Sequence, residues 1–193
     1  MTIIEAIAAV LGIIGVYLTT KQKIWCWPIG IVSVSIYVYI FYGVNLYSDM
    51  ILNIFYIIMQ AYGWYHWLHG GDKTNDLPVT LLSNNQRFIW AGSGAIGIFL
   101  WGWAMDNYTN ADLPYWDAAT TIISMIAQWY MARKKLEAWI LWTVVNVMNI
   151  IIYIVKDLYF TSGLFVVYLG LAVLGYIRWK KYMKAQKTEE ILQ

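Results

Sequence analysis

The stretch 136–156, LEAWILWTVVNVMNIIIYIVK, most constrains the fold, because it is apolar enough to cross a bilayer and still carries two amides. A helix that spans the hydrocarbon core needs about 20 mostly apolar residues. Trp139, Trp142, Asn146 and Asn149 recur at helical spacing, which places them on one stripe of such a helix. The stripe predicts either an aromatic-walled, hydrated ligand site near the midplane or amides that only hydrogen-bond neighbouring helices.

The composition supports a membrane location for the whole chain. Only 12% of its 193 residues are charged and 61% are hydrophobic, whereas a soluble domain is usually about 25% charged. The net charge of +2 is too small to indicate nucleic-acid binding. The single cysteine, Cys26, excludes an intrachain disulfide framework and a multi-cysteine metal site. We expect no cleavable signal peptide, because the N-terminus lacks a basic leader.

Apolar runs predict an all-α integral membrane protein with seven transmembrane helices in a single membrane domain. The predicted spans are residues 3–20, 24–43, 47–69, 87–105, 114–132, 136–156 and 159–181. The long connector 70–86 contains Gly, Asp, Asn and Pro, which indicates a polar surface loop. The charged residues 182–193 predict a cytoplasmic tail that frays into solvent.

The basic residues predict an outside N-terminus and a cytoplasmic C-terminus. With this orientation, twelve of the thirteen Lys and Arg residues fall on the inner side and only Lys156 falls outside. The inner residues are Lys21, Lys23, Lys73, Arg87, Arg133, Lys134, Lys135, Arg178, Lys180, Lys181, Lys184 and Lys187. So uneven a distribution also favours an odd number of spanning helices.

An internal repeat appears when the chain is shifted by 112 residues, because its two ends then align without a gap. Basic, Trp, Tyr and Gly positions coincide in one register. The matched pairs are Lys21 with Arg133, Lys23 with Lys135, Trp27 with Trp139, Tyr56 with Tyr168, Gly63 with Gly175 and Trp67 with Trp179. The repeat predicts two parallel three-helix units, 3–69 and 114–181, joined by the connector helix 87–105. Carriers built from such repeats hold substrate between them near the midplane.

Polar side chains recur at helical spacing on three of the predicted spans. Three amphipathic faces without an ionised group at a helix centre predict the wall of a cavity for a polar solute, although hydrogen bonding between helices remains the alternative. Amides can exchange hydrogen bonds with hydroxyls or a carboxamide, and indoles or phenols can stack on a cationic ring. The candidate site residues are Asn53, Tyr56, Gln60, Thr121, Ser124, Gln128, Trp139, Trp142, Asn146 and Asn149.

The residue types favour a uniporter over other functions. A proton-coupled pump usually carries a buried titratable relay, and no phosphate-binding loop indicates ATP hydrolysis. A sodium-coupled carrier stays open, because backbone carbonyls can bind sodium. A membrane-embedded enzyme would need a catalytic acid, base or nucleophile in its cavity, and the sequence offers no convincing set. We therefore expect no enzyme activity, no cofactor and no metal site. A purely structural or sensory bundle is the remaining alternative.

Several sequence words resemble the Pnu-type vitamin transporters, and most closely the PnuC family of nicotinamide riboside transporters. They are WPIG at 27–30, LYSDM at 46–50, YGWYHW at 62–67, AQWYMARKKLEAWILW at 127–142 and GYIRWKK at 175–181. The words occur in family order and spacing over nearly the whole chain. The resemblance implies a full-length SWEET-like arrangement of three, one and three helices, and a homotrimer in a bacterial inner membrane.

The same resemblance implies facilitated diffusion of nicotinamide riboside, which a cytoplasmic vitamin kinase traps by phosphorylation. It implies substrate contacts by Gln128, Trp139, Trp142 and Asn146, with Asn149 also matching. This chain departs from the family at Asn53, where Gln is more common, and at Gln60, where a small residue is common. These departures keep thiamine open as the alternative substrate, with riboflavin a less common cargo of related members.

Overall fold

The computed structural model of the protein describes residues 3–43, 47–71, 77–109 and 113–192. Within these ranges the chain forms seven α-helices joined by short connections, so it is an all-helical protein. The helices are α1 (Ile3–Thr20), α2 (Cys26–Gly43), α3 (Tyr47–His69), α4 (Asn84–Tyr108), α5 (Pro114–Ala132), α6 (Glu137–Val155) and α7 (Tyr159–Leu192).

The observed helices match the predicted ranges closely, with two extensions that have a local cause. Helix α4 begins earlier because Ser83 and Gln86 form a capping box, in which each side chain accepts a hydrogen bond from the other residue's backbone N–H. Helix α7 continues through Leu192, so the prediction that the tail frays from residue 182 is wrong. The tail is rich in Lys, Gln, Glu and Ala, which favour helix.

Five of the described helices are long and apolar enough to cross a membrane: α1, α2, α4, α6 and α7. Helices α3 and α5 have sufficient length, with 23 and 19 residues, but their polar side chains lower their hydropathy. Asn53 and Gln60 lie on α3, and Thr121, Ser124 and Gln128 lie on α5. Two of the three helices that present predicted polar faces, α3 and α5, are therefore outside this set of five, whereas α6 belongs to it.

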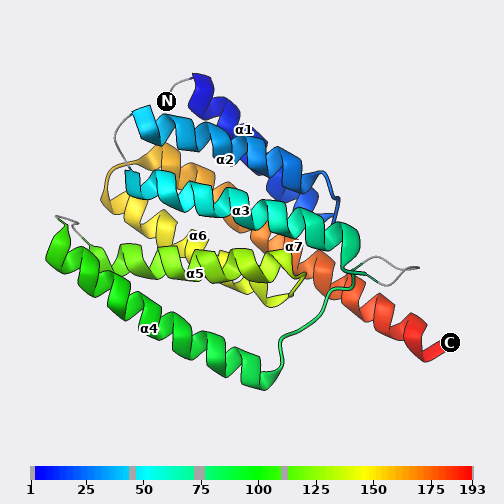
Figure 1. Ribbon diagram of the computed structural model, residues 1–193. Helices are drawn as coiled ribbons and strands as arrows, with labels where there is room; N and C mark the ends of the chain where they lie inside the picture. Colours follow the sequence, from blue (N-terminus) through cyan, green and yellow to red (C-terminus); the bar gives the residue numbers. More distant parts are fainter. Residues whose placement is uncertain (1–2, 44–46, 72–76, 110–112, 193) are drawn as a thin grey trace.

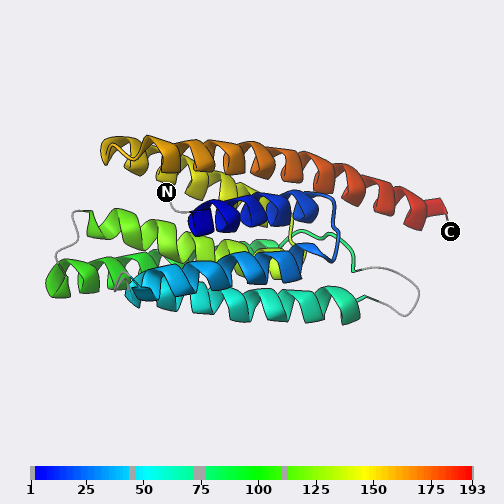
Figure 2. The same ribbon diagram turned by 90° about the horizontal axis from the view of Figure 1, so that it is seen from above.

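Six of the helices form a closed ring (Figures 1 and 2). Along this ring α1 packs on α2, α2 on α3, α3 on α5, α5 on α6, α6 on α7, and α7 on α1. Helix α4 packs against α5, outside the ring. Consecutive helices run in opposite directions (Figure 1). The ring therefore closes through two contacts between distant parts of the sequence, α1 with α7 and α3 with α5.

Basic residues gather at the end of the bundle where α1 and α5 finish, which we call the basic end. Lys21 and Lys23 follow α1, and Arg133 to Lys135 follow α5. The backbone turns there are alike: Gln22 and Lys134 both adopt positive φ, at 55° and 49°. The N–H groups of Lys21 and Lys23 donate to the carbonyl of Leu18, as those of Arg133 and Lys135 donate to that of Tyr130.

Four buried tryptophans form a cluster near the basic end, and we call it the four-indole cluster. Trp27 meets Trp67 edge to face at 5.1 Å between ring centroids, and Trp139 meets Trp179 in the same way at 5.4 Å. Trp67 and Trp179 contact each other at 5.8 Å. The Trp67 indole donates to the carbonyl of Met131 in α5, and that of Trp179 donates to the carbonyl of Thr19 in α1. Both contacts that close the ring therefore carry an indole hydrogen bond.

The second half of the predicted surface loop 70–86 is buried against the basic end. Leu77, Val79 and Leu82 have exposed fractions of 9%, 2% and 8%. The backbone of Thr80 forms a bridge with the chain at 134–136, accepting from Leu136 N–H and donating to the carbonyl of Lys134. The prediction of a polar surface loop is therefore wrong for Leu77, Val79 and Leu82, which belong to the buried hydrophobic core, whereas Leu81 is exposed. Residues 72–76 lie outside the described part of the chain.

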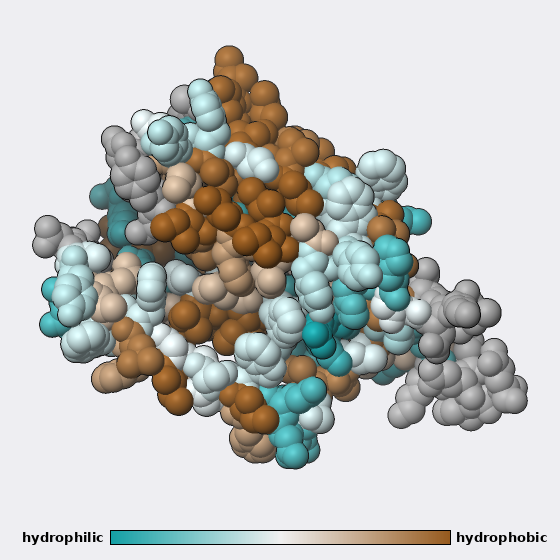
Figure 3. Space-filling view, viewed as in Figure 1, coloured by the Kyte–Doolittle hydropathy of each residue, from teal (hydrophilic) through white to brown (hydrophobic). Residues whose placement is uncertain are grey.

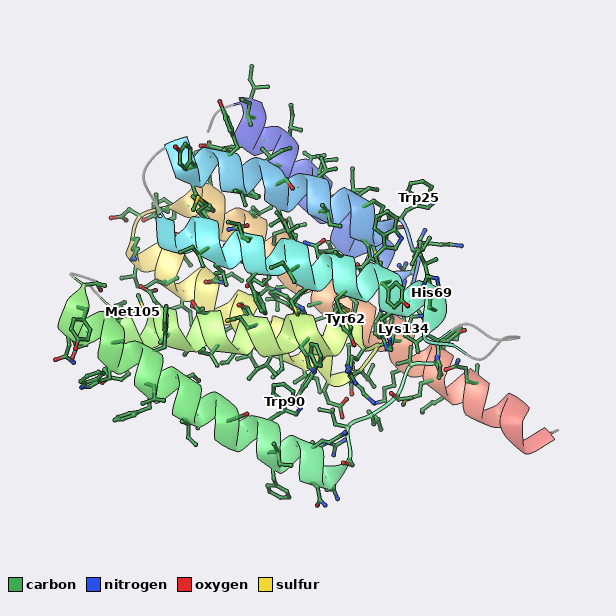
Figure 4. The ribbon with its side chains drawn as sticks, viewed as in Figure 1. Trp25, Tyr62, His69, Trp90, Met105 and Lys134 are labelled. Atoms are coloured by element: carbon green, nitrogen blue, oxygen red, sulfur yellow. The ribbon has the colours of Figure 1, made fainter. Side chains whose placement is uncertain are left out.

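Lys134 fixes this segment to the bundle (Figure 4). Its Nζ donates to the carbonyl of Leu77 at 2.9 Å and lies 4.5 Å from the ring centroid of Trp67. The side chain is only 4% exposed. Glu137 adds a second tie, because its Oε1 accepts from Leu82 N–H and from Arg87. The segment thus covers the outer side of the four-indole cluster.

The outer surface of the bundle is apolar, as expected for helices that face lipid. Large hydrophobic side chains are exposed on the ring helices and on α4; Phe88, for example, is 78% exposed and Ile3 is 81% exposed. Hydrophobic residues gather over the middle of the face in Figure 3, and hydrophilic ones lie toward its margins.

The packing of Trp139 predicts that Gly175→Ala lowers stability. A Cβ at Gly175 would lie 2.6 Å from three carbons of the Trp139 ring, which Trp179 holds from another side. Such overpacking costs about 1–3 kcal/mol, so we expect a lower melting temperature for the purified protein in detergent. Gly170→Ala on the same helix is the control, because its Cβ meets nothing within 4 Å. Equal melting temperatures for the two variants would contradict the packing.

Candidate functional site

A cavity of about 290 Å³ lies inside the helix ring. Side chains or backbone of α1, α2, α3, α5, α6 and α7 line it, whereas α4 contributes nothing among the described residues. Its lining contains Gly12, Gly15, Val16, Thr19, Cys26, Trp27, Gly30, Ser33, Val34, Tyr37, Asn53, Tyr56, Gln60, Gln128, Met131, Trp139, Trp142, Asn146, Phe165, Tyr168 and Ala172. The cavity is therefore a product of ring closure and belongs to both halves of the chain.

Seven of the ten candidate site residues line this cavity. They are Asn53, Tyr56, Gln60, Gln128, Trp139, Trp142 and Asn146. They come from α3, α5 and α6, which are separated in sequence and brought together by the contact of α3 with α5. The arrangement thus places amides and aromatic rings around one space.

The structure leaves Thr121, Ser124 and Asn149 outside the cavity lining. Ser124 supports the wall, since its Oγ lies 2.6 Å from the Tyr56 hydroxyl and donates to the carbonyl of Thr121. Asn149 lies about one turn beyond Asn146 on α6. Tyr37 is the residue equivalent to Asn149 when the chain is shifted by 112 residues. Its side chain is longer than that of Asn149 and reaches the cavity.

Sequence reasoning missed the contributions of α1, α2 and α7. Trp27, Tyr37, Phe165 and Tyr168 all line the cavity. The internal alignment contained a usable signal, because it pairs Tyr168 with the candidate Tyr56 and Trp27 with the candidate Trp139. Polar spacing alone could not find these residues, since α2 and α7 carry aromatic rings instead of a polar stripe.

Four carboxamides line the cavity, and one of them, Asn53, donates to the carbonyl of Asp49. Gln60 and Asn146 are 9% and 4% exposed, and Gln128 lines the wall beside them. Within the described chain no hydrogen bond joins these three carboxamides to a protein partner. A buried amide without a partner is unfavourable by about 1–3 kcal/mol. The three amides are therefore available to water or a polar ligand.

The cavity is uncharged in its described lining, which contains no Asp, Glu, Lys, Arg or His. Its aromatic walls come from Trp27, Trp139, Trp142, Tyr37 and Tyr168. Indole and phenol faces attract planar and cationic rings, and amides offer both donors and acceptors. The arrangement suits a neutral or cationic aromatic solute that carries hydroxyl or amide groups.

The four-indole cluster forms the wall of the cavity toward the basic end. Trp27 and Trp139 line the cavity and pack at their other edges on Trp67 and Trp179. Their own indole N–H groups are buried without a hydrogen-bond partner in the described chain. The two rings thus present apolar surface to the cavity at this end.

The chain offers little basis for a metal centre. Among the described residues no group of three His, Cys, Asp or Glu side chains lies close enough to hold an ion. His66 and His69 each stack on a tyrosine of their own helix, Tyr62 and Tyr65. Their rings therefore serve packing at the end of α3.

Known proteins similar to this chain are transporters. The family model for the nicotinamide mononucleotide transporter matches residues 2–181. The nicotinamide riboside transporter PnuC of Neisseria mucosa is 31% identical, with 94% of this chain and 73% of that protein aligned. PnuC of Escherichia coli is 24% identical over 91% of this chain and 84% of the relative.

Two further similarities bear on fold and cargo. A crystal structure of the vitamin B3 transporter PnuC matches with a TM-score of 0.75 and 29% identity, covering 94% of this chain and 82% of that one. The riboflavin/roseoflavin transporter RibM of Streptomyces davaonensis is 24% identical over 91% of this chain and 83% of its own length. With its closed ring of apolar helices around an uncharged cavity, the chain belongs to the nicotinamide mononucleotide transporter family, a family of membrane transporters and not of enzymes.

Proposed function

We propose that this protein carries nicotinamide riboside across a bacterial membrane by facilitated diffusion, and that the cavity inside the helix ring is its substrate site. The uncharged lining of carboxamides and aromatic rings is the observation that carries the proposal. Relatives titled as nicotinamide riboside transporters align over more than nine-tenths of this chain.

The chemistry of the riboside matches the cavity group by group. Its pyridinium ring is planar and cationic, which suits stacking on Trp139 and Trp142. Its carboxamide and sugar hydroxyls need donors and acceptors, which Gln60, Gln128 and Asn146 can supply. A volume of about 290 Å³ is near the lower end for small-molecule sites, so a compact nucleoside fits the space better than the larger riboflavin.

The lining also favours the riboside over the mononucleotide. A phosphate carries nearly two negative charges at neutral pH, and burying an unpaired charge is strongly unfavourable. The described lining offers no Lys, Arg or His to pair with it. We therefore propose that the phosphorylated form is excluded, which is consistent with trapping of the substrate by a cytoplasmic vitamin kinase.

We propose that all seven helices span the membrane as two parallel three-helix repeats joined by α4. Contacts support this arrangement, because Trp27 packs over Gly63 as Trp139 packs over Gly175. The two tryptophans are 112 residues apart in the sequence, and so are the two glycines. The hydrogen bond from Trp67 to Met131 corresponds in the same way to the one from Trp179 to Thr19. An axis along the membrane normal would relate such repeats, as in SWEET-type carriers.

The orientation and assembly complete the proposal. The basic end would face the cytoplasm, with the N-terminus outside, in a bacterial inner membrane. A homotrimer is the assembly implied by the family resemblance, and each protomer would work alone because one chain supplies the whole described cavity wall. The uncharged lining supports uniport by alternating access without a coupled ion.

The first prediction concerns ligand choice. Titration of the purified protein by calorimetry should show binding of nicotinamide riboside and at least about tenfold weaker binding of the mononucleotide, because the phosphate lacks a cationic partner. Thiamine and riboflavin belong in the same titration series. Thiamine binding without a response to the riboside would replace the proposed substrate.

The second prediction concerns Asn146. Asn146→Leu removes one of the buried carboxamides that face the cavity, so riboside affinity should fall about tenfold or more. Asn107→Leu is the matched control, because Asn107 is exposed on α4, outside the cavity lining, and its amide donates to the carbonyl of Trp103. Retained binding in the Asn146 variant would show that the amide serves packing.

The third prediction concerns energetics of transport. Liposomes that contain the protein should equilibrate radiolabelled riboside without an imposed proton or sodium gradient, since the described lining holds no titratable relay. Uptake should follow the riboside gradient alone. A requirement for either ion gradient would contradict the uniport mechanism.

A further inference from the structure

The two halves of the cavity differ at two pairs of equivalent positions. In the 112-residue offset, Gly30 of α2 corresponds to Trp142 of α6, and Gln60 of α3 corresponds to Ala172 of α7. All four residues line the cavity. The half that contains α6 and α7 therefore has the large indole of Trp142 and the methyl group of Ala172. The half that contains α2 and α3 has no side chain at Gly30 and has the carboxamide of Gln60.

The absence of a side chain at Gly30 creates the seat of Gln60. A Cβ built on Gly30 would overlap Oε1 of Gln60, and it would lie 3.1 Å from its Cδ and 3.6 Å from its Nε2. The carboxamide thus lies against the α2 backbone at the position from which the Trp142 side chain would start in the other half. Any larger residue at position 30 would displace the amide.

The carboxamide of Gln60 has donors and an acceptor that form no hydrogen bond within the described chain. Gln60 is only 9% exposed and lines the cavity. Within the described chain its amide has no hydrogen-bond partner, whereas the nearby Tyr56 hydroxyl is already committed to Ser124. A buried amide in this condition requires a partner from water or ligand. The amide of Gln60 is therefore available to pair with water or a polar ligand in the cavity.

We infer that Gln60, held in the notch at Gly30, is a specificity-determining residue that binds the sugar hydroxyls of the substrate, while Trp142 takes its planar ring. This inference rests on the proposed function of the cavity. The carboxamide can donate to one hydroxyl and accept from its neighbour. A nucleoside with a vicinal diol then has one preferred orientation inside the helix ring. The difference between Gly30 with Gln60 on one side and Trp142 with Ala172 on the other sets this orientation.

The test compares two ligands on two proteins. Calorimetry measures binding of nicotinamide riboside and of its 2′,3′-dideoxy analogue to the wild type and to Gln60→Ala. For the wild type we expect the analogue to bind about tenfold more weakly. In Gln60→Ala the affinity for the riboside should fall by about the same factor. The affinity for the analogue should change little, because the analogue lacks the hydroxyls that Gln60 would bind.

A second variant reaches the same residue through the backbone. Gly30→Ala fills the notch and displaces Gln60, so it should reproduce the selective loss for the riboside. Gly43→Ala on the same helix is the control, because its Cβ meets nothing within 4 Å. If Gly30→Ala does not fold, the comparison with Gln60→Ala still decides.

The outcomes separate this inference from the proposed function. Equal losses for both ligands in Gln60→Ala would indicate a structural role and overturn the inference, as would unchanged binding of both. In either case wild-type binding of the riboside would leave the proposed function standing. Failure of the wild type to bind the riboside would instead reject the proposed function and this inference with it.

Discussion

The structure depends on the way the helix ring closes at the four-indole cluster. Trp67 and Trp179 meet each other, and each donates its indole N–H across a contact between distant helices. Hydrocarbon provides no hydrophobic force between helices, so close packing and such hydrogen bonds must hold them together. These two contacts help to fix α1 to α3 relative to α5 to α7 at the basic end, and they position the indoles that pack behind the cavity wall.

Recognition and membrane insertion place opposite demands on α3 and α5. Their carboxamides and hydroxyls line or support the cavity, and the same groups leave both helices below the hydropathy of a self-sufficient spanning segment. The ring resolves this conflict by flanking each of them with apolar neighbours, α2 beside α3 and α6 beside α5. A helix that is too polar alone can thus be stable within a bundle.

Helical spacing in the sequence located cavity-lining residues where the spacing reflects one face of a helix. Helical spacing on α6 brought Trp139, Trp142 and Asn146 to the cavity, because residues on one stripe of a helix face one neighbour. Asn149 lies outside the cavity lining, since periodicity gives direction but not depth or side-chain reach. Sequence reasoning failed for Leu77, Val79 and Leu82, where polar neighbours concealed apolar residues that pack on the bundle. Gly30 carried no signal at all, because its role is the space that it leaves for Gln60.

Within the proposed repeats, framework positions have stayed alike while cavity positions have diverged. Trp27 and Trp139 lie on equivalent glycines, Gly63 and Gly175, so the packing that shapes the ring is the same in both halves. Lining positions differ: Val34 corresponds to Asn146, and Gly30 corresponds to Trp142. The divergence has a physical reason, since a nucleoside has no two-fold symmetry and a symmetric wall would match its ring and its sugar equally poorly. Equivalent packing in the two halves thus coexists with an asymmetric cavity lining, and such a lining suits the asymmetric solute that we propose.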